Sequence, residues 1–259
     1  MRKHLKKKFL HQVELTDEVK KITENSSLGL PIDRMKEIKK LPDGYTTFLM
    51  TEDNKFFKSF TFKHEGKLKF IPEPDPILVY FNAAYSNYKT LQTRREEILN
   101  ILSKEKMTEV MINELYDYFG ASSSFIILLF TSIEALINRC IKTDYQYKKI
   151  TSRKTELYSK SQIENYFPFE EKIKTILPDA TGKNFSEKFS NKYIHINNLK
   201  EFRDMIVHTK EATGESTYDY IYKKALIFKY EETINAVRDF CNFYTKDNFI
   251  EECDCSSDW

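Results

Sequence analysis

The chain has 259 residues, of which 41% are hydrophobic and 31% are charged. That balance is ordinary for a soluble globular protein, and the length suits one large domain or two small ones. Six glycines and seven prolines are too few for long disordered linkers. The formal net charge of +2 does not by itself imply a nucleic-acid partner.

Charge is distributed unevenly between the two ends of the sequence. Five basic residues lie within residues 1–9, whereas the stretch 247–259 has five acidic residues and no basic one. A basic N-terminal segment could bind phosphate, although a solvated terminus is the commoner explanation. We therefore expect an acidic tail over 247–259 and leave the role of the basic end open.

The sequence predicts a cytoplasmic protein without a membrane segment. Its N-terminal residues lack the apolar stretch of a signal peptide, and the longest apolar run, Phe125–Phe130, is far too short to cross a membrane. Cys253 and Cys255 are too close together and too isolated for a zinc site, while Cys140 and Cys241 fall on predicted helices. We expect reduced thiols, no bound metal and no cofactor.

Residues 1–75 predict a small α+β subdomain. Two short helices are expected over 15–25 and 31–41. Three segments rich in aromatic and β-branched residues then alternate with turn residues, which predicts an antiparallel meander. Its strands are expected over 45–51, 56–63 and 67–71. The proline-rich segment 72–76 ends this pattern and marks a domain boundary.

Residues 76–246 are expected to form a helical bundle. Apolar residues spaced by three or four predict its helices over 77–102, 107–141, 197–209 and 218–244. The segment 125–137 is apolar on nearly all sides and predicts the most buried helix, and Gly120 is expected to kink or break the chain before it. An insertion over 143–196 is expected to contain two or three short helices and loops. The predicted fold class is therefore mainly α, with a small α+β subdomain at the N-terminus.

The helix expected over 197–209 contains the residues best suited to chemistry. Arg203, Asp204 and His208 lie within about two turns of one another near its C-terminal end. Asp204 and His208 are four residues apart and therefore neighbours, so the carboxylate could fix the tautomer of the imidazole. Arg203 and His208 are five apart and do not share a face. The long arginine side chain, the position of His208 near the helix end, or a second copy of the helix in a symmetric dimer could bring them together.

The hexapeptide Arg203–His208 resembles the signature of the HEPN superfamily, the small helical-bundle domains named for higher eukaryotes and prokaryotes nucleotide-binding. That signature is an arginine, four to six further residues and a histidine, near the C-terminal end of a helix. Many members also carry an acidic residue on an earlier core helix, and Glu134 within Ser132–Asn138 is similar. The resemblance extends over 77–244 and does not include the first 75 residues.

The resemblance implies a metal-independent endoribonuclease that acts as a toxin or antiviral-defence effector. RNA is the implied substrate, a homodimer the implied assembly, and an antitoxin or defence-system protein a further partner. His208 would serve as general base or acid, and Arg203 would hold the phosphate. Asp204 would orient His208, and Glu134 would position Arg203 through an ion pair. Asp204 stands where asparagine or histidine is also frequent in the family, and its negative charge would repel a substrate phosphate.

Other residues admit two interpretations. Glu134 on an apolar helix is costly unless it is paired, so a structural ion pair with Arg139 or a nearby lysine is the alternative to a functional role. His195 lies in an apolar setting and is expected to be structural. The basic residues of the insertion are interleaved with tyrosines and could bind RNA, although a solvated surface is the favoured interpretation. These residues are Lys148, Lys149, Arg153 and Lys154.

A non-catalytic HEPN-like module that binds protein or nucleotide is the alternative to an enzyme. Both interpretations predict the same fold and differ at the site. In an enzyme, Arg203 and His208 would converge in an open basic cleft across a two-fold axis, whereas in a module they would lie apart or be covered by their own chain. A third interpretation assigns the activity to the β-meander and only dimerisation to the bundle.

Overall fold

The computed structural model describes residues 4–7, 47–50, 56–102, 108–152, 154–209, 218–245 and 250–253. The chain divides into two compact units, one formed by Lys8–Asp75 and the other by Met1–Lys7 together with Pro76–Trp259. The division after Asp75 falls within the proline-rich segment. The first seven residues group with the second unit, not with the subdomain that follows them in sequence. The helices predicted over 15–25 and 31–41 lie outside the described residues.

The smaller unit contains the predicted antiparallel meander. Its strands are β2 (Thr47–Met50), β3 (Phe56–His64) and β4 (Lys67–Pro72), which pair in that order. Glu65 and Gly66 connect β3 to β4 with positive φ angles of 49° and 75°. Such a pair of residues forms the two-residue turn whose twist matches that of a hairpin. The aromatic and β-branched pattern therefore predicted this sheet correctly.

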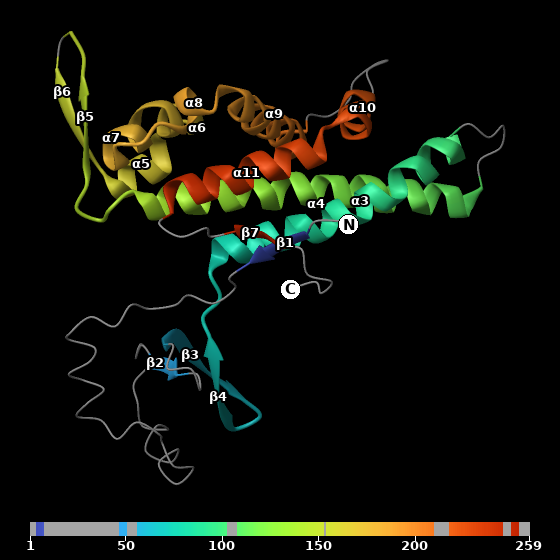
Figure 1. Cartoon of the computed structure of the whole chain (residues 1–259), viewed down its shortest axis with the longest axis horizontal. Coiled ribbons are helices and arrows are strands. Elements are labelled where there is room, and N and C mark those ends of the chain that lie inside the picture. The colour runs from blue at the N-terminus through green and yellow to red at the C-terminus, as the bar shows by residue number, and fades with distance from the viewer. Residues whose placement is uncertain are drawn as a thin grey trace. The chain divides into compact units, whose positions relative to one another are not determined.

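The larger unit is mainly helical, and its long helices lie side by side (Figure 1). Its α-helices are α3 (Pro76–Leu102), α4 (Glu109–Cys140), α5 (Lys160–Tyr166), α6 (Phe169–Glu171), α7 (Leu177–Thr181), α8 (Phe185–Lys188), α9 (Ser190–Val207), α10 (Asp219–Ile227) and α11 (Tyr230–Tyr244). A π-helix, η2 (Lys172–Ile176), joins α6 to α7, and the strands are β1 (His4–Lys7), β5 (Gln146–Ile150), β6 (Thr155–Ser159) and β7 (Ile250–Cys253).

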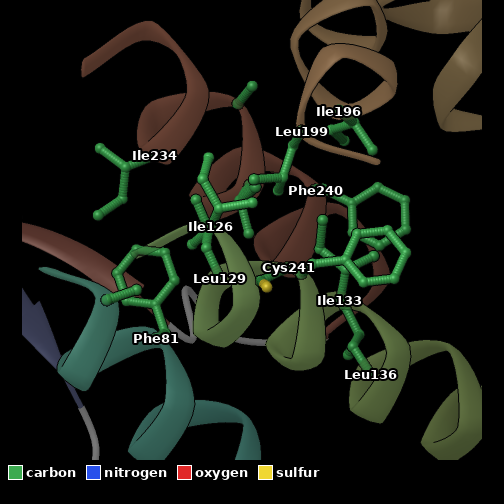
Figure 2. Packing of buried hydrophobic residues seen from close by; sticks show 14 of the residues in the cluster. Phe81, Ile126, Leu129, Ile133, Leu136, Ile196, Leu199, Ile234, Phe240 and Cys241 are labelled. Atoms are coloured by element: carbon green, nitrogen blue, oxygen red, sulfur yellow. The ribbon is translucent and has the colours of Figure 1, made fainter. Parts of the chain in front are cut away.

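Helix α4 lies at the centre of this unit and packs against α3, α9 and α11. Figure 2 shows side chains from these four helices meeting in one apolar cluster, and those that it labels are at most 2% exposed. The labelled residues are Phe81, Ile126, Leu129, Ile133, Leu136, Ile196, Leu199, Ile234, Phe240 and Cys241. Burial of such side chains contributes about 1.5–3 kcal/mol each. This core fixes α4 and α9 relative to each other, which positions the charged residues at its edge.

Two properties of α4 follow from its sequence. The helix is long and apolar enough to cross a membrane by length and composition alone, but half of its most apolar 18-residue window is buried inside the fold. A core helix of a soluble protein has this property. The helix also continues through Gly120 without the break that was one of the two expectations. Helix α3 contacts it on both sides of the glycine, through the Arg94–Glu114 ion pair and the ring contact of Tyr88 with Phe125, and this packing outweighs the low helix propensity of glycine.

Three predicted elements differ from the structure. Strands β5 and β6 form a hairpin where short helices and loops were expected, and α9 begins at Ser190, before the predicted start at 197. The single helix expected over 218–244 is two helices, α10 and α11. Phe228 between them is extended, and its ring packs 5.3 Å from that of Phe202 and 5.1 Å from that of Tyr230. The apolar periodicity continues through this break and therefore concealed it.

The two ends of the chain pair with each other. Strand β1 runs antiparallel to β7, with Lys6 opposite Glu251 and Leu5 opposite Glu252. The basic N-terminal segment is thus joined through its backbone to the acidic C-terminal segment. For residues 4–7 and 250–253 the two ends of the chain are therefore paired strands of the larger unit.

Candidate functional site

Arg203 is held in place where α9 passes α4. Its guanidinium carbon lies 4.1 Å from the centroid of the Phe130 ring, and its Nη2 is 3.5 Å from Oε1 of Glu134. Its Nη1 donates a hydrogen bond of 2.8 Å to Oδ1 of Asp204. Only 22% of the arginine side chain is exposed. We call these four residues the Arg203 centre. The predicted ion pair between Glu134 and Arg203 is thus confirmed as a contact.

The face of α4 that meets Arg203 combines a ring with a carboxylate. Phe130 and Glu134 are four residues apart, so they lie one above the other on the helix. Phe130 is 1% exposed and also packs 4.7 Å from the ring of Phe169 in α6. A cation over a buried aromatic face gains about 0.5–2 kcal/mol. The arginine is therefore fixed by packing as well as by charge.

Asp204 does not orient His208 as predicted. Its Oδ2 is 2.9 Å from Nζ of Lys200, and its Oδ1 accepts the bond from Arg203. In the described part of the chain, the Asp204 carboxylate has no hydrogen bond to His208. The residue bonds to His208 through its backbone instead, its carbonyl oxygen accepting from the His208 amide at 3.0 Å. Two cations flank this carboxylate and offset the repulsion that it would exert on a phosphate.

His208 is exposed at the C-terminal end of α9. Its φ and ψ angles of −106° and 34° depart from helical values, so its side chain leaves the helical position that would place it beside Asp204. The hydroxyl of Thr209 donates to the carbonyl oxygens of Met205 and Ile206 and closes the last turn. Among the described residues, no hydrogen bond or ion pair joins the imidazole to Arg203 or Glu134. A single chain thus fixes the arginine and leaves the histidine open to solvent.

Lys172 is a site residue that the sequence interpretation missed. It begins the π-helix η2, and its Nζ donates a hydrogen bond of 2.7 Å to the carbonyl oxygen of Glu164. Burial lowers the pKa of Lys172, opposed by the negative charges of Glu134 and Glu164. Burial likewise raises the pKa of Glu134, opposed by the charges of Arg203 and Lys172. The Glu134 carboxylate therefore interacts with two cations, Arg203 on α9 and Lys172 on η2.

The π-turn that places Lys172 has a local cause. Pro178 lies in the continuous helical run from α6 to α7 and has no N–H to donate to the carbonyl of Lys174. Its ring would also clash with that carbonyl in a regular α-helix. The wider turn of η2 directly before the proline, in which the Leu177 amide bonds back to the Lys172 carbonyl, relieves this conflict. A proline inside a helical run was the only sequence signal for this feature.

The basic residues predicted to contact RNA lie on or beside the β5–β6 hairpin. Lys149 forms a 2.7 Å ion pair with Glu171. Lys154 forms an ion pair of the same length with Glu156. Lys148 is exposed, and Arg153 lies outside the described residues. Pairing with acids offsets the charge of two of these lysines, which weakens the case for a strong phosphate-binding surface here.

The arrangement can bind a phosphate and move protons. A guanidinium is a strong, bidentate phosphate ligand, and an imidazole can both donate and accept hydrogen bonds. The described residues contain no group of three or more histidine, cysteine, aspartate or glutamate side chains that could hold a metal ion. Comparison with known proteins finds no matching family model, no similar curated protein and no similar solved structure.

Proposed function

We propose that the chain is a metal-independent endoribonuclease of the HEPN type, acting in the cytoplasm as a toxin or antiviral-defence effector. The observation that carries this proposal is the Arg203 centre. Its guanidinium is held against Phe130 and Glu134 on the core helix, five residues before a histidine at the end of α9. An arginine that is already ordered loses less entropy when it binds a phosphate.

In the proposed reaction, the ribose 2′-oxygen attacks the adjacent phosphorus. A 2′-O–P bond forms, the bond from phosphorus to the 5′-oxygen breaks, and the products are a 2′,3′-cyclic phosphate and a 5′-hydroxyl. His208 takes the proton of the 2′-hydroxyl or gives one to the leaving 5′-oxygen. Arg203 binds the phosphate and stabilises the negative charge that develops on its oxygens. These roles require no metal ion.

A homodimer is part of the proposal because one chain holds only Arg203 in place. A two-fold axis near the end of α9 would bring His208 of one copy toward Arg203 of the other. Helices α9 and α10 pack against each other and both carry exposed apolar side chains. These side chains support an interface at this end of the unit. They are Val207 (52% exposed), Tyr220 (43%), Tyr222 (45%) and Ile227 (72%).

One observation favours the alternative, a non-catalytic HEPN-like module that binds protein or nucleotide. Both terminal nitrogens of Arg203 already contact carboxylates, Nη1 that of Asp204 and Nη2 that of Glu134. In a non-catalytic module, these ion pairs would stabilise the fold and Arg203 would bind no phosphate. In the enzyme, the substrate phosphate instead competes with Asp204 for one edge of the guanidinium.

Incubation of the full-length protein with bulk RNA in the presence of EDTA tests the enzyme proposal. We expect wild-type protein to generate fragments ending in 2′,3′-cyclic phosphate, and His208→Ala to leave the RNA intact. Cleavage that is absent from both proteins, or equal in both, would overturn the proposal. The Lys192→Ala variant is a matched surface control, because Lys192 lies on the same helix and pairs with Asp239 on α11.

A further inference from the structure

A pocket adjoins the Arg203 centre, with which it shares Glu134. It has a volume of about 210 Å³ and is lined by Glu134, Ile137, Asn138, Glu164, Phe169 and Lys172. Pockets that bind whole drug-sized ligands measure about 300–1,000 Å³. The smaller volume suits one sugar–phosphate unit. Glu134 belongs both to the pocket and to the Arg203 centre, so the two are continuous.

Lys172 supplies the positive charge of this pocket. Its ammonium gives one hydrogen bond to the Glu164 carbonyl, which leaves two of its three donors for a ligand. Glu134 interacts with both this ammonium and the guanidinium of Arg203, whereas Glu164, which also lines the pocket, lies 3.8 Å from Lys160. These three cations and two carboxylates together carry one net positive charge. Glu134 and Glu164 only partly offset the cost of burying this lysine, and a negatively charged ligand in the adjoining pocket would offset it further.

Asn138 supplies a neutral hydrogen-bonding group to the same pocket. It is four residues after Glu134 on α4, so the two side chains lie on one face of the helix. Within the ranges that the structure describes, the Asn138 amide makes no hydrogen bond. An amide can both donate to and accept from a ribose hydroxyl. The apolar walls of the pocket are Ile137 and Phe169, which is only 8% exposed.

We propose that this pocket binds the ribonucleotide next to the scissile phosphate of a single-stranded RNA, with Lys172 contacting its phosphate and Asn138 its 2′-hydroxyl. This inference rests on the proposed ribonuclease function and assigns the part of the substrate that lies beside Arg203. A contact to the 2′-hydroxyl distinguishes RNA from DNA. The pocket would therefore contribute selectivity for RNA in the binding step, before any bond is broken.

Binding to a labelled single-stranded RNA, and to the DNA of the same sequence, tests the proposal by fluorescence anisotropy. All proteins carry His208→Ala so that the RNA stays intact. Lys172→Met is expected to weaken RNA and DNA binding equally, by about tenfold. It should also reduce the slope of log affinity against log salt by about 0.7, the value for one lost phosphate contact to a single strand. Lys172→Arg should restore the slope.

Asn138→Ala has a different expected signature. It should weaken RNA binding about fivefold and leave DNA binding unchanged, because only RNA offers the 2′-hydroxyl. The matched controls are Lys174→Met and Asn165→Ala. Lys174 is exposed on the same π-helix, and the Asn165 amide is already bonded to the Ser161 carbonyl. Neither control should change affinity or salt slope, and thermal unfolding verifies that every variant is folded.

The proposal is overturned if Lys172→Met leaves the salt slope of the folded protein unchanged, or if Asn138→Ala weakens RNA and DNA binding alike. Failure of the proposed function has a different result. In that case wild-type protein does not cut RNA in EDTA, whatever the binding experiment shows. If cleavage depends on His208 but RNA affinity is the same with and without Lys172, the proposed function is retained. The assignment of the pocket is then refuted.

Discussion

Arg203 and His208 lie on the same helix, yet their surroundings differ sharply. The arginine is mostly covered, with Phe130 beneath its guanidinium and carboxylates at both terminal nitrogens. The histidine ends the helix, is exposed, and among the described residues bonds to the rest of the chain only through its backbone. One chain thus holds in place the arginine that we propose binds a phosphate, but does not position the histidine that we propose moves protons.

The difference follows from where each residue lies relative to the core. Leu199 and Phe202 on α9 are fully or almost fully buried, so the helix is pinned against α4 up to the level of Arg203. Beyond that level Met205 and Ile206 are only partly buried against the core, and Val207 is 52% exposed. Side chains there are free to meet another molecule. Variants that act on only one of the two residues test whether this difference holds.

The largest effect is expected at the two motif residues. His208→Ala should reduce RNA cleavage by about 10²–10⁴-fold, as loss of a general acid or base does, with no change in stability. Arg203→Ala should reduce cleavage to a similar extent and also lower the free energy of unfolding by about 1 kcal/mol, because the contact with Phe130 is lost. Cleavage rates and urea unfolding curves measure the two effects. Equal stability losses in both variants would contradict the contrast.

The next largest effect is expected on stability, when Phe130 beneath Arg203 is replaced. Phe130→Ala should lower the free energy of unfolding by about 3–5 kcal/mol, because the ring is 1% exposed and packs against Phe169. Phe130→Leu should lose less than half as much. Chemical denaturation provides the measurement. If Phe130→Leu keeps most of the stability but loses cleavage, the ring acts by holding Arg203, whereas unchanged cleavage would argue against this role.

Glu134→Gln should separate positioning from stability. We expect a change in unfolding free energy within about 1 kcal/mol, because the ion pair is partly exposed, but a loss of cleavage of about 10- to 100-fold. Burial raises the pKa of Glu134, and only its ionised form holds Arg203. The ratio of wild-type to variant activity should therefore shrink as the pH falls through that raised pKa. A ratio independent of pH would contradict the positioning role.

The smallest expected effect is on stability at Lys172. Burial lowers its pKa below the usual 10.5, so between the two values the unfolded chain binds more protons and wild-type stability rises with pH. Lys172→Met removes this charge and should stabilise the fold by at most about 1 kcal/mol near neutral pH. That advantage should shrink as the pH rises toward 10.5. Thermal unfolding of both proteins across this range tests it, and an advantage that grows with pH would be inconsistent.

The long helices and the meander could be predicted from the sequence because their signals are local. Residues of α3 such as Leu78, Phe81 and Tyr85 repeat every three or four positions and are buried. The β5–β6 hairpin could not be predicted in this way, because Tyr147 is the one buried residue of its two strands and the apolar Ile150 and Leu157 are exposed. The break between α10 and α11 was missed since apolar spacing continues through the extended Phe228.

The site could be predicted only in part. The contact between Arg203 and Glu134 joins residues far apart in sequence, and only the resemblance suggested it. Lys172 depends on a π-turn, which leaves little trace in the sequence beyond Pro178. The partner of Asp204 was predicted incorrectly because His208 leaves the helical geometry that its spacing assumes.

One chain is proposed to hold half of a site, so mixing two inactive variants should restore cleavage. In a dimer that combines Arg203→Ala with His208→Ala, one of the two shared sites retains its arginine from one copy and its histidine from the other. An equal mixture that exchanges subunits should recover about a quarter of wild-type cleavage, since half of the dimers are mixed and each has one intact site. No recovery, with exchange demonstrated, would contradict the account.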